Sequence, residues 1–246
     1  MGLEASLVGR WQCNGKDMLG LAFSGGKDSL ACWYMYREQQ PVVMWVNTGK
    51  AYPETIAIVN EIRAEAKEFI EIPSDQQAQI ERTGIPSDVV PVDWTVFGVT
   101  VAGEKPIKIQ TYFGCCFENI AMPLMETAKT RGITRLIRGQ RLNDGHKSSA
   151  VNNSIVDGIT YVQPIETWTE EQVFAFILKH RAKLPDHYAI KHTSLDCYDC
   201  TAFLGDSADR VAWTKLKYPA FYAKYAANMA DLKTALAPSM KILGTH

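Results

Sequence analysis

The sequence has little of what marks secreted, membrane-spanning or strongly basic proteins. Its 246 residues include six cysteines, too few for a disulfide-stabilised secreted scaffold, so grouped cysteines here favour metal binding or catalysis. No apolar run approaches the ~18–20 residues of a membrane span, and residues 1–10 lack the apolar core of a signal peptide. The net charge of −1 gives the whole chain no electrostatic attraction to nucleic acids or membranes. We therefore expect a cytoplasmic protein without a membrane partner.

The chain does have the pattern of a globular α/β protein. Its composition, 46% hydrophobic and 22% charged, excludes disordered and coiled-coil chains. Apolar runs alternate with helical periodicities, which predicts a parallel sheet whose strands are joined by helices. The predicted strands are residues 18–23, 41–46, 69–72, 134–138 and 160–165, and the predicted helices are residues 30–39, a segment starting near Pro53, 117–130 and 169–180. Thr167 or Thr169 is the expected N-cap of the last of these helices.

Two segments depart from this alternation. Between Asp88 and Phe113, valines and isoleucines stand among glycines and a proline, which predicts a β-ribbon insertion. From about residue 206 to residue 246 the pattern is helical. Because no repeat or flexible linker interrupts the chain, we expect one domain over residues 1–246, with the insertion at about 88–113 and a helical C-terminus.

The segment Ser24–Ser29, which reads Ser-Gly-Gly-Lys-Asp-Ser, follows the first predicted strand and precedes a helix. Two adjacent glycines let backbone amides approach an anion closely, and the helix start adds a positive dipole end. Lys27 adds a full positive charge, and the two serines add hydroxyl donors. The spacing is not that of the common P-loop, because Leu21 stands where that motif has its first glycine. A tight turn with a surface lysine is the alternative, but the whole hexapeptide predicts a cradle for phosphate, pyrophosphate or sulfate.

This hexapeptide resembles the PP-loop of the adenine nucleotide α-hydrolases, a superfamily that includes ATP pyrophosphatases and sulfonucleotide reductases. Three further segments resemble the adenylyl-sulfate and phosphoadenylyl-sulfate (APS/PAPS) reductases: Asn47-Thr48-Gly49 with Pro53-Glu54-Thr55, then Gly139-Gln140-Arg141, then residues 164–177. Asn47 stands where that family more often has Asp. The resemblance covers residues 18 to 201 and implies a parallel-sheet PP-loop fold. The nucleotide-binding residues that it implies are Ser24, Gly25, Gly26, Lys27, Asp28, Ser29, Asn47, Thr48, Gly49, Gly139 and Arg141.

Lys27 and Arg141 are the candidate catalytic cations. Arg141 and Lys147 follow a strand that should run parallel to the first, so both are expected at the carboxyl edge of the sheet, where α/β proteins bind ligands. Arg141 is the better candidate of these two, because a planar guanidinium matches the geometry of phosphate or sulfate.

Four cysteines form two groups: Cys115 and Cys116 are adjacent, and Cys197 and Cys200 form a Cys-x-x-Cys motif. Taken alone, the adjacent pair is typical of buried thiols, and the spaced pair suits either a metal ligand pair or a redox dithiol. These alternatives stay open on the residues alone.

The resemblance favours one of them. Residues 115–124 resemble the Cys-Cys-x-x-Arg-Lys-x-x-Pro-Leu segment of the APS reductases, and residues 194–201 resemble their Ser-Ile-Gly-Cys-x-x-Cys-Thr segment. This implies a four-iron four-sulfur (4Fe-4S) cluster held by Cys115, Cys116, Cys197 and Cys200. Asn119 and Ile120 stand where the family has Arg and Lys, so the charge usual beside the cluster is missing or comes from elsewhere.

The resemblance implies a reductase-like oxidoreductase, yet one expected group is missing. Sulfonucleotide reductases attack the sulfate sulfur with a cysteine near the C-terminus, and thioredoxin or glutaredoxin then frees sulfite. Here no cysteine follows Cys200. The nucleophile is therefore unidentified, with Cys13 as the candidate thiol.

Two other functions stay open. In the first, the protein is an ATP pyrophosphatase that uses ATP with Mg²⁺ to adenylate an acceptor, and sulfur is then transferred to this acceptor. The acceptor is a small molecule or a nucleic acid, and the basic and aromatic C-terminal segment would contact the nucleic acid. In the second, it is a non-catalytic nucleotide sensor. We expect a homo-oligomer and an adenine nucleotide, which is APS, PAPS or ATP.

Overall fold

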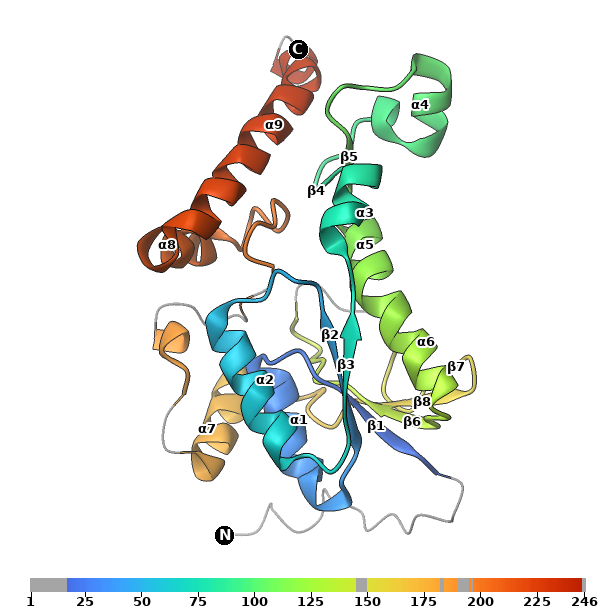
Figure 1. Cartoon of the computed structure of the whole chain (residues 1–246), viewed down its shortest axis with the longest axis vertical. Helices are drawn as coiled ribbons and strands as arrows, with labels where there is room; N and C mark the ends of the chain where they lie inside the picture. The colour runs from blue at the N-terminus through green and yellow to red at the C-terminus, as the bar shows by residue number, and fades with distance from the viewer. Residues whose placement is uncertain (1–16, 145–149, 182–183, 190–194, 196, 245–246) are drawn as a thin grey trace. The chain divides into compact units, whose positions relative to one another are not determined.

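The computed structural model describes residues 17–144, 150–181, 184–189, 195 and 197–244 (Figure 1). Contacts divide the chain into two compact units that alternate along the sequence. The first comprises Met1–Trp45, Ile56–Ile72 and Leu124–Leu184, and the second comprises Val46–Thr55, Pro73–Pro123 and Pro185–His246. The single domain over residues 1–246 stays a prediction.

A six-stranded sheet, ordered β3-β2-β1-β6-β8-β7, forms the centre of the first unit. Strand β1 pairs in parallel with β2 and β6, β6 pairs in parallel with β8, and β7 adds an antiparallel edge. The strands are β1 Leu19–Ala22, β2 Val42–Asn47, β3 Phe69–Pro73, β6 Arg135–Ile137, β7 Ile155–Val156 and β8 Ile159–Val162. This confirms the predicted α/β fold with a mostly parallel sheet.

Helices cover both faces of this sheet. Figure 1 shows α1, α2 and α7 on one side of it and α6 on the other. They are α1 Lys27–Tyr36, continued by a short 3₁₀ turn at Arg37–Gln39, α2 Pro53–Glu65, α6 Met122–Thr130 and α7 Glu170–His180. Strand residues Leu21, Val43 and Leu136 and helix residues Ile62 and Ile177 are fully buried, so apolar burial holds the layers together.

The order of the strands reverses between β1 and β6. From β1 the chain continues to β2 and β3 on one side, and it returns through β6 and β8 on the other. Ligands of open α/β sheets bind outside the carboxyl ends of the strands at such a reversal. The loops that follow β1 and β6 are Phe23–Gly26 and Arg138–Arg141, and this reversal makes them neighbours.

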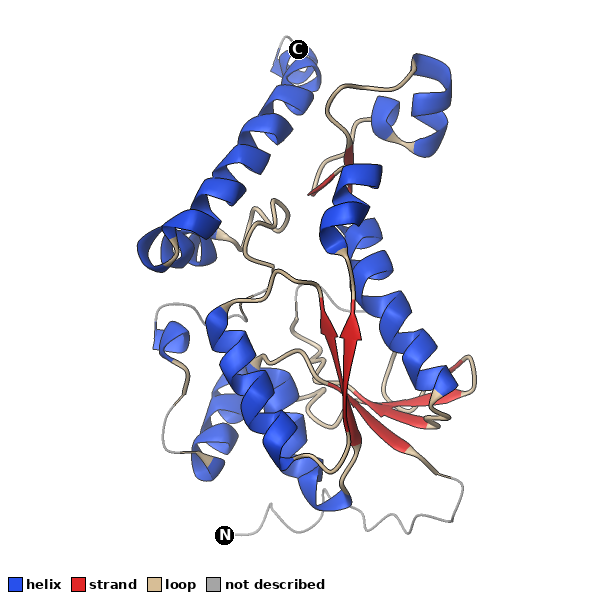
Figure 2. Cartoon of the chain, in the orientation of Figure 1, coloured by secondary structure: helices blue, strands red, loops and turns tan. Residues whose placement is uncertain are grey.

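The second unit is mainly helical (Figure 2). Its small core packs α9 against a two-stranded parallel sheet through Ile85, Ile109, Leu232 and Ala235. The elements are α3 Gln76–Thr83, β4 Ile85–Ser87, a 3₁₀ turn at Val92–Trp94, α4 Val96–Ala102, β5 Ile109–Thr111, α5 Tyr112–Cys116, a π-helical turn at Phe117–Ala121, a 3₁₀ turn at Asp186–Ala189, α8 Ala208–Lys217 and α9 Pro219–Gly244. The helical C-terminus is thus confirmed. Along the described residues, no helix combines the length and the apolar character needed to cross a membrane.

The predicted β-ribbon over residues 88–113 is wrong. Its longest element is the helix α4, and its one strand, β5, pairs in parallel with β4, which precedes the segment, so there is no hairpin within it. The Thr95 hydroxyl caps α4 by accepting a hydrogen bond from the Gly98 amide at 3.1 Å. A Cβ at Gly98 would lie 1.8 Å from the Val92 carbonyl oxygen, so the compact turn requires glycine there. The cap and this close approach outweigh the strand preference of the valines.

The helix predicted over residues 117–130 also differs in detail. It starts earlier, as α5, and widens into the π-helical turn before α6. The Met122 amide donates to the Phe117 carbonyl five residues back. Pro123 has no amide proton, so regular α-helical bonding is interrupted at this point.

Thr169, and not Thr167, caps α7. Its hydroxyl accepts from the Gln172 amide at 3.3 Å, and the Gln172 side chain accepts from the Thr169 amide at 2.8 Å, which completes a capping box. We predict that Thr169→Ala lowers the free energy of unfolding by about 1 kcal/mol, because it leaves the Gln172 amide uncapped. Urea denaturation followed by circular dichroism measures this. Thr169→Ser should retain most of the stability, and Thr167→Ala, at an exposed position with no capping role, should change it little; an equal loss in Thr167→Ala would contradict the assignment.

Candidate functional site

The Ser24–Ser29 segment, called the glycine loop here, joins β1 to α1. Gly25 has a φ of +78°, which side chains other than hydrogen rarely permit, and Gly26 is the N-cap of α1. Because Gly26 has no side chain, it cannot cap the amides of the first helical turn. Amides that no side chain caps can donate hydrogen bonds to a bound anion.

The two serine hydroxyls hold this loop in shape. Ser29 Oγ donates to the Gly26 carbonyl at 2.9 Å and accepts from the Ser24 amide at 3.2 Å. The two hydroxyls lie 3.1 Å apart, and Ser24 Oγ also accepts from the Gly26 amide at 3.3 Å. The serines therefore preorganise the backbone, in addition to any contact with a ligand.

Two buried cations lie at the glycine loop, each facing carboxylates. Lys27 Nζ lies 2.8 Å from Asp28 Oδ2 and 3.6 Å from Glu170 Oε2, at the start of α7. Arg141, after β6, has Nε 3.2 Å from Asp28 Oδ1 and an NH2 group 2.9 Å from Asp144. The carboxylates outnumber the cations by one, so this group of five side chains carries a net negative charge.

Asp28 is the centre of this group. Burial raises the pKa of its carboxyl group, while Lys27 and Arg141 act in the opposite direction. Asp28 Oδ1 and Arg141 Nε are close enough for an ion pair, yet within the described structure neither atom has a hydrogen bond. A buried guanidinium nitrogen without a hydrogen bond is a donor available to an anionic ligand.

Gly139 brings the second loop against the first. A Cβ at this position would lie 2.6 Å from the backbone carbon of Asp28 and 2.8 Å from the amide nitrogen of Ser29. Glycine is therefore required for the close approach that places Arg141 beside Asp28. This is the physical reason for the glycine that opens the Gly139–Arg141 segment after β6.

The predicted residues Asn47, Thr48 and Gly49 belong to the second unit, at the end of β2. Asn47 Oδ1 accepts from the Gly49 amide at 2.9 Å, and Gly49 has a φ of +75°. Asparagine thus serves here as a turn-forming residue, which needs no negative charge.

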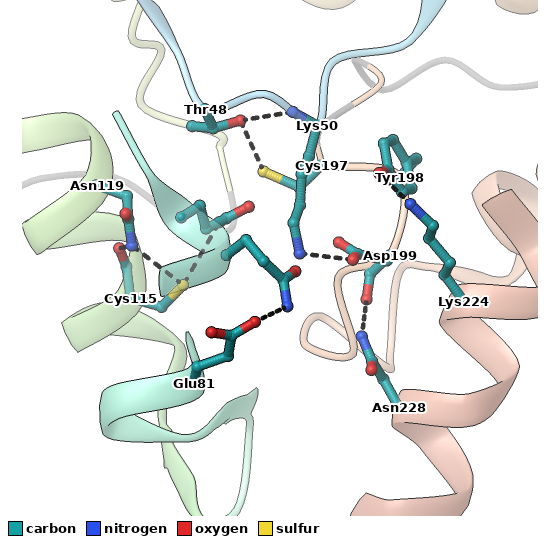
Figure 3. A network of polar contacts seen from close by, with 12 residues as sticks. Thr48, Lys50, Glu81, Cys115, Asn119, Cys197, Tyr198, Asp199, Lys224 and Asn228 are labelled. Carbon is teal, nitrogen blue, oxygen red and sulfur yellow. Dashed lines mark hydrogen bonds and ion pairs between the residues drawn. The ribbon is translucent and has the colours of Figure 1, made fainter. Parts of the chain in front are cut away.

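The four predicted cluster ligands also belong to the second unit. Cys115 is buried at the end of α5, whereas Cys116, Cys197 and Cys200 are half-buried. Thr48 Oγ1 lies 3.6 Å from Cys197 Sγ, so the Asn47–Gly49 turn and the Cys-x-x-Cys segment are in contact (Figure 3).

The Cys-x-x-Cys segment is firmly held on both sides. Lys50 Nζ binds Asp199 Oδ2 at 2.6 Å, with both side chains about 6% exposed (Figure 3). The Lys50 carbonyl accepts from the Tyr198 amide at 3.0 Å. From α8, the buried guanidinium of Arg210 donates to the carbonyls of Cys197 and Cys200 at 3.4 and 2.8 Å. Backbone and charge together fix this turn.

The donor chemistry suits an iron–sulfur cluster, but the described side chains do not gather into one. Burial raises the pKa of the Cys115 thiol, and hydrogen bonds from Gln76 and Asn119 and the charge of Lys50 oppose this. Among the residues that the structure describes, no three His, Cys, Asp or Glu side chains are placed so as to hold a metal ion. The cluster, and Mg²⁺ with ATP, therefore stay predictions.

The structure thus brings Lys27, Asp28, Gly139 and Arg141 together, as predicted. Cys13 and Lys147 lie outside the described residues. The sequence reasoning missed Asp144, Glu170, Lys50 and Asp199. The Glu-Glu pair after the Thr169 cap was a usable signal for Glu170, since acidic residues favour the first turn of a helix.

We predict that Lys50→Met lowers the free energy of unfolding by about 3–5 kcal/mol, because it leaves the Asp199 carboxylate buried without its partner. Thermal or urea denaturation of Lys50→Met, Asp199→Asn and the double variant measures the coupling, and the double variant should lose less than the sum of the single losses. Lys129→Met is the matched control, because Lys129 pairs with Asp157 at the same 2.6 Å but both side chains are about half exposed. Its loss should stay below about 1 kcal/mol. Equal losses in both lysine variants would show that burial does not strengthen the Lys50 pair.

Several solved structures resemble the chain at low identity. Phosphoadenylyl-sulfate (PAPS) reductase from Candida auris, in a phosphate complex, is 17% identical over 69% of this chain and 76% of its own, with a TM-score of 0.44. A mutant FMN adenylyltransferase from Candida glabrata is 11% identical over 72% of this chain and 52% of its own, with a TM-score of 0.45. Yeast FAD synthetase in complex with FAD is 13% identical over 69% of this chain and 52% of its own, with a TM-score of 0.39. The match thus covers about half the length of these last two proteins. A comparison with curated proteins finds no match.

The family comparison matches most of the chain. The model of the phosphoadenosine phosphosulfate reductase domain matches residues 19–203, from the first residue of β1 to just beyond the Cys-x-x-Cys motif. This range includes the glycine loop, the Gly139–Arg141 loop and the four grouped cysteines. The chain therefore belongs to the phosphoadenosine phosphosulfate reductase domain family, within the PP-loop adenine nucleotide α-hydrolases.

Proposed function

We propose that this protein binds an adenine nucleotide through the glycine loop and reduces a sulfonucleotide, APS or PAPS, as a reductase-like enzyme. The observation that carries the proposal is the start of α1. Its N-cap residue Gly26 has no side chain to cap the helix amides, and the buried cations Lys27 and Arg141 lie beside them. Donors fixed before the ligand arrives stabilise negative charge without reorganisation. The family match supports this assignment.

In the proposed reaction, Lys27, Arg141 and the loop amides bind the oxyanion end of the nucleotide. A cysteine thiolate attacks the sulfate sulfur, the bond from sulfur to the bridging oxygen breaks, and AMP (from APS) or its 3′-phosphate (from PAPS) leaves with the electron pair. A dithiol protein such as thioredoxin or glutaredoxin then releases sulfite and becomes oxidised to a disulfide. Cys13 is the thiol that the sequence offers as nucleophile.

Cys115, Cys116, Cys197 and Cys200 would hold the 4Fe-4S cluster that we include in the proposal. When bound, such a cluster supplies a redox-active and electrostatic centre. The chain's own contribution is to hold the Cys-x-x-Cys turn through Lys50, Asp199 and Arg210.

One observation favours a second candidate, an ATP pyrophosphatase that adenylates an acceptor. Asp28, Asp144 and Glu170 already face the two cations Lys27 and Arg141. A polyphosphate that enters a site with excess carboxylate is best accompanied by a divalent cation, which suits ATP with Mg²⁺. For the nucleic-acid acceptor considered above, the aromatic side chains of the C-terminal helices offer little, because Trp213, Tyr218 and Phe221 pack in or against a buried cluster.

We predict that Lys27→Met weakens nucleotide binding by about tenfold to a hundredfold, because it removes a charge-assisted hydrogen bond worth about 1.5–3 kcal/mol. Isothermal titration calorimetry with APS, PAPS and ATP with Mg²⁺ measures the dissociation constants. Lys67→Met, at an exposed position in the first unit, is the control and should leave them unchanged. Unchanged affinity in Lys27→Met would overturn the assignment of the glycine loop.

The products identify the reaction. We expect anaerobically purified protein, supplied with a thiol reductant, to convert APS into sulfite and AMP, or PAPS into sulfite and the 3′-phosphate of AMP, and to contain about four iron atoms per chain. Ion chromatography and iron analysis measure both. Pyrophosphate from ATP would establish the adenylating enzyme in its place, and tight binding without turnover would establish the sensor.

Cys13→Ser should abolish sulfite formation, and persistence of sulfite would exclude Cys13 as nucleophile.

A further inference from the structure

Lys27, the cation of the glycine loop, is contacted by a carboxylate from a different helix. Glu170 Oε2, at the start of α7, lies 3.6 Å from Lys27 Nζ. The Lys27 side chain is 4% exposed, whereas the Glu170 side chain is 27% exposed. The glycine loop, α1 and α7 all belong to the first unit, and α7 packs beside α1 (Figure 1). The contact therefore joins a buried ammonium to a carboxylate that solvent reaches.

The two carboxylates that face Lys27 differ in what they are attached to. Asp28 is the next residue on α1, lies 2.8 Å from the Lys27 ammonium and also faces Arg141 Nε at 3.2 Å. It is part of the glycine loop and moves only with it. Glu170 belongs to another helix, so its contact with Lys27 can break while the loop keeps its shape. Of these two carboxylates, Glu170 is the one that a ligand can displace.

A displaced Glu170 carboxylate keeps a favourable position. The capping box formed by Thr169 and Gln172 fixes the start of α7, and Glu170 is its first helical residue. A carboxylate in the first turn of a helix is stabilised by the positive end of the helix dipole. This stabilisation remains when Lys27 binds something else. Glu170 can therefore alternate between the Lys27 ammonium and the start of its own helix.

A ligand oxyanion and the Glu170 carboxylate require the same ammonium. Both are negative hydrogen-bond acceptors, so the binding of one disfavours the other. This competition weakens every oxyanion, and it matters most for small ions, because a nucleotide can add contacts through its base and ribose. Penalties of this kind are a common source of specificity.

Resting on the proposed function, we infer that Glu170 is a specificity-determining residue of the glycine loop. Its carboxylate competes with the ligand for Lys27, and it thereby keeps inorganic phosphate and sulfate out of the loop at concentrations where nucleotides bind. These two ions have the oxyanion geometry that the loop accepts, so they are the small competitors that a nucleotide meets there.

The test measures the dissociation constants of inorganic phosphate, inorganic sulfate and AMP by isothermal titration calorimetry on the full chain. Glu170→Gln should tighten the binding of all three by about threefold to tenfold, because the effect of a half-buried charge pair lies between that of an exposed pair and that of a buried one. In a Lys27→Met background the same substitution should give a smaller gain in AMP affinity, because the contested ammonium is gone. A gain in affinity is not what a merely structural role of Glu170 would produce.

Glu126→Gln is the matched control, because it removes the same charge from an exposed position on α6, on the other face of the sheet (Figure 1). It should bind all three ligands as the wild type does, and circular dichroism melting verifies that each variant is folded. Unchanged or weaker binding in Glu170→Gln would overturn the inference, as would an equal gain in Glu126→Gln or an undiminished gain in the Lys27→Met background. In these cases AMP binding by the wild type still supports the proposed function. If AMP does not bind to the wild type, the proposed function fails, and the inference fails with it.

Discussion

The site in the first unit depends on the approach of two loops across the reversal in strand order. Because β1 and β6 are neighbours, the turn after each strand emerges at the same edge, and Gly139 lets the second turn come within van der Waals distance of the Asp28 backbone. Arg141 owes its place beside Asp28 to this contact. A single methyl group at residue 139 would disturb the backbone that orients both cations.

The charge balance at this place shapes the chemistry. Lys27 is buried, and a buried ammonium needs compensation, which Asp28 and Glu170 supply. An oxyanion that bound at these cations would therefore have to displace carboxylates that already contact them. This favours ligands with several negative oxygens, or ligands that bring a cation of their own, over a weak monoanion.

Much of the fold could be predicted from sequence, because apolar runs, the Gly-Gly turn and the Pro53 helix start are local signals. The segment from Asp88 to Phe113 could not, since a cap at Thr95 and a close approach at Gly98 decide its structure against the strand preference of its valines. Lys27 and Arg141 could be predicted from their motifs. The contact of Lys27 with Glu170 and the Lys50–Asp199 pair join residues as far as 149 positions apart, and no local pattern reports such contacts.

The alternation of the two units along the chain has a consequence for how the protein is made. The polypeptide passes between the units five times, after Trp45, Thr55, Ile72, Pro123 and Leu184. Neither unit is a contiguous stretch of sequence, so no truncation yields either one intact. During synthesis, the first unit stays incomplete until its last segment, which ends at Leu184, has been made, and the second unit waits for α9. Both units are therefore completed only late in translation.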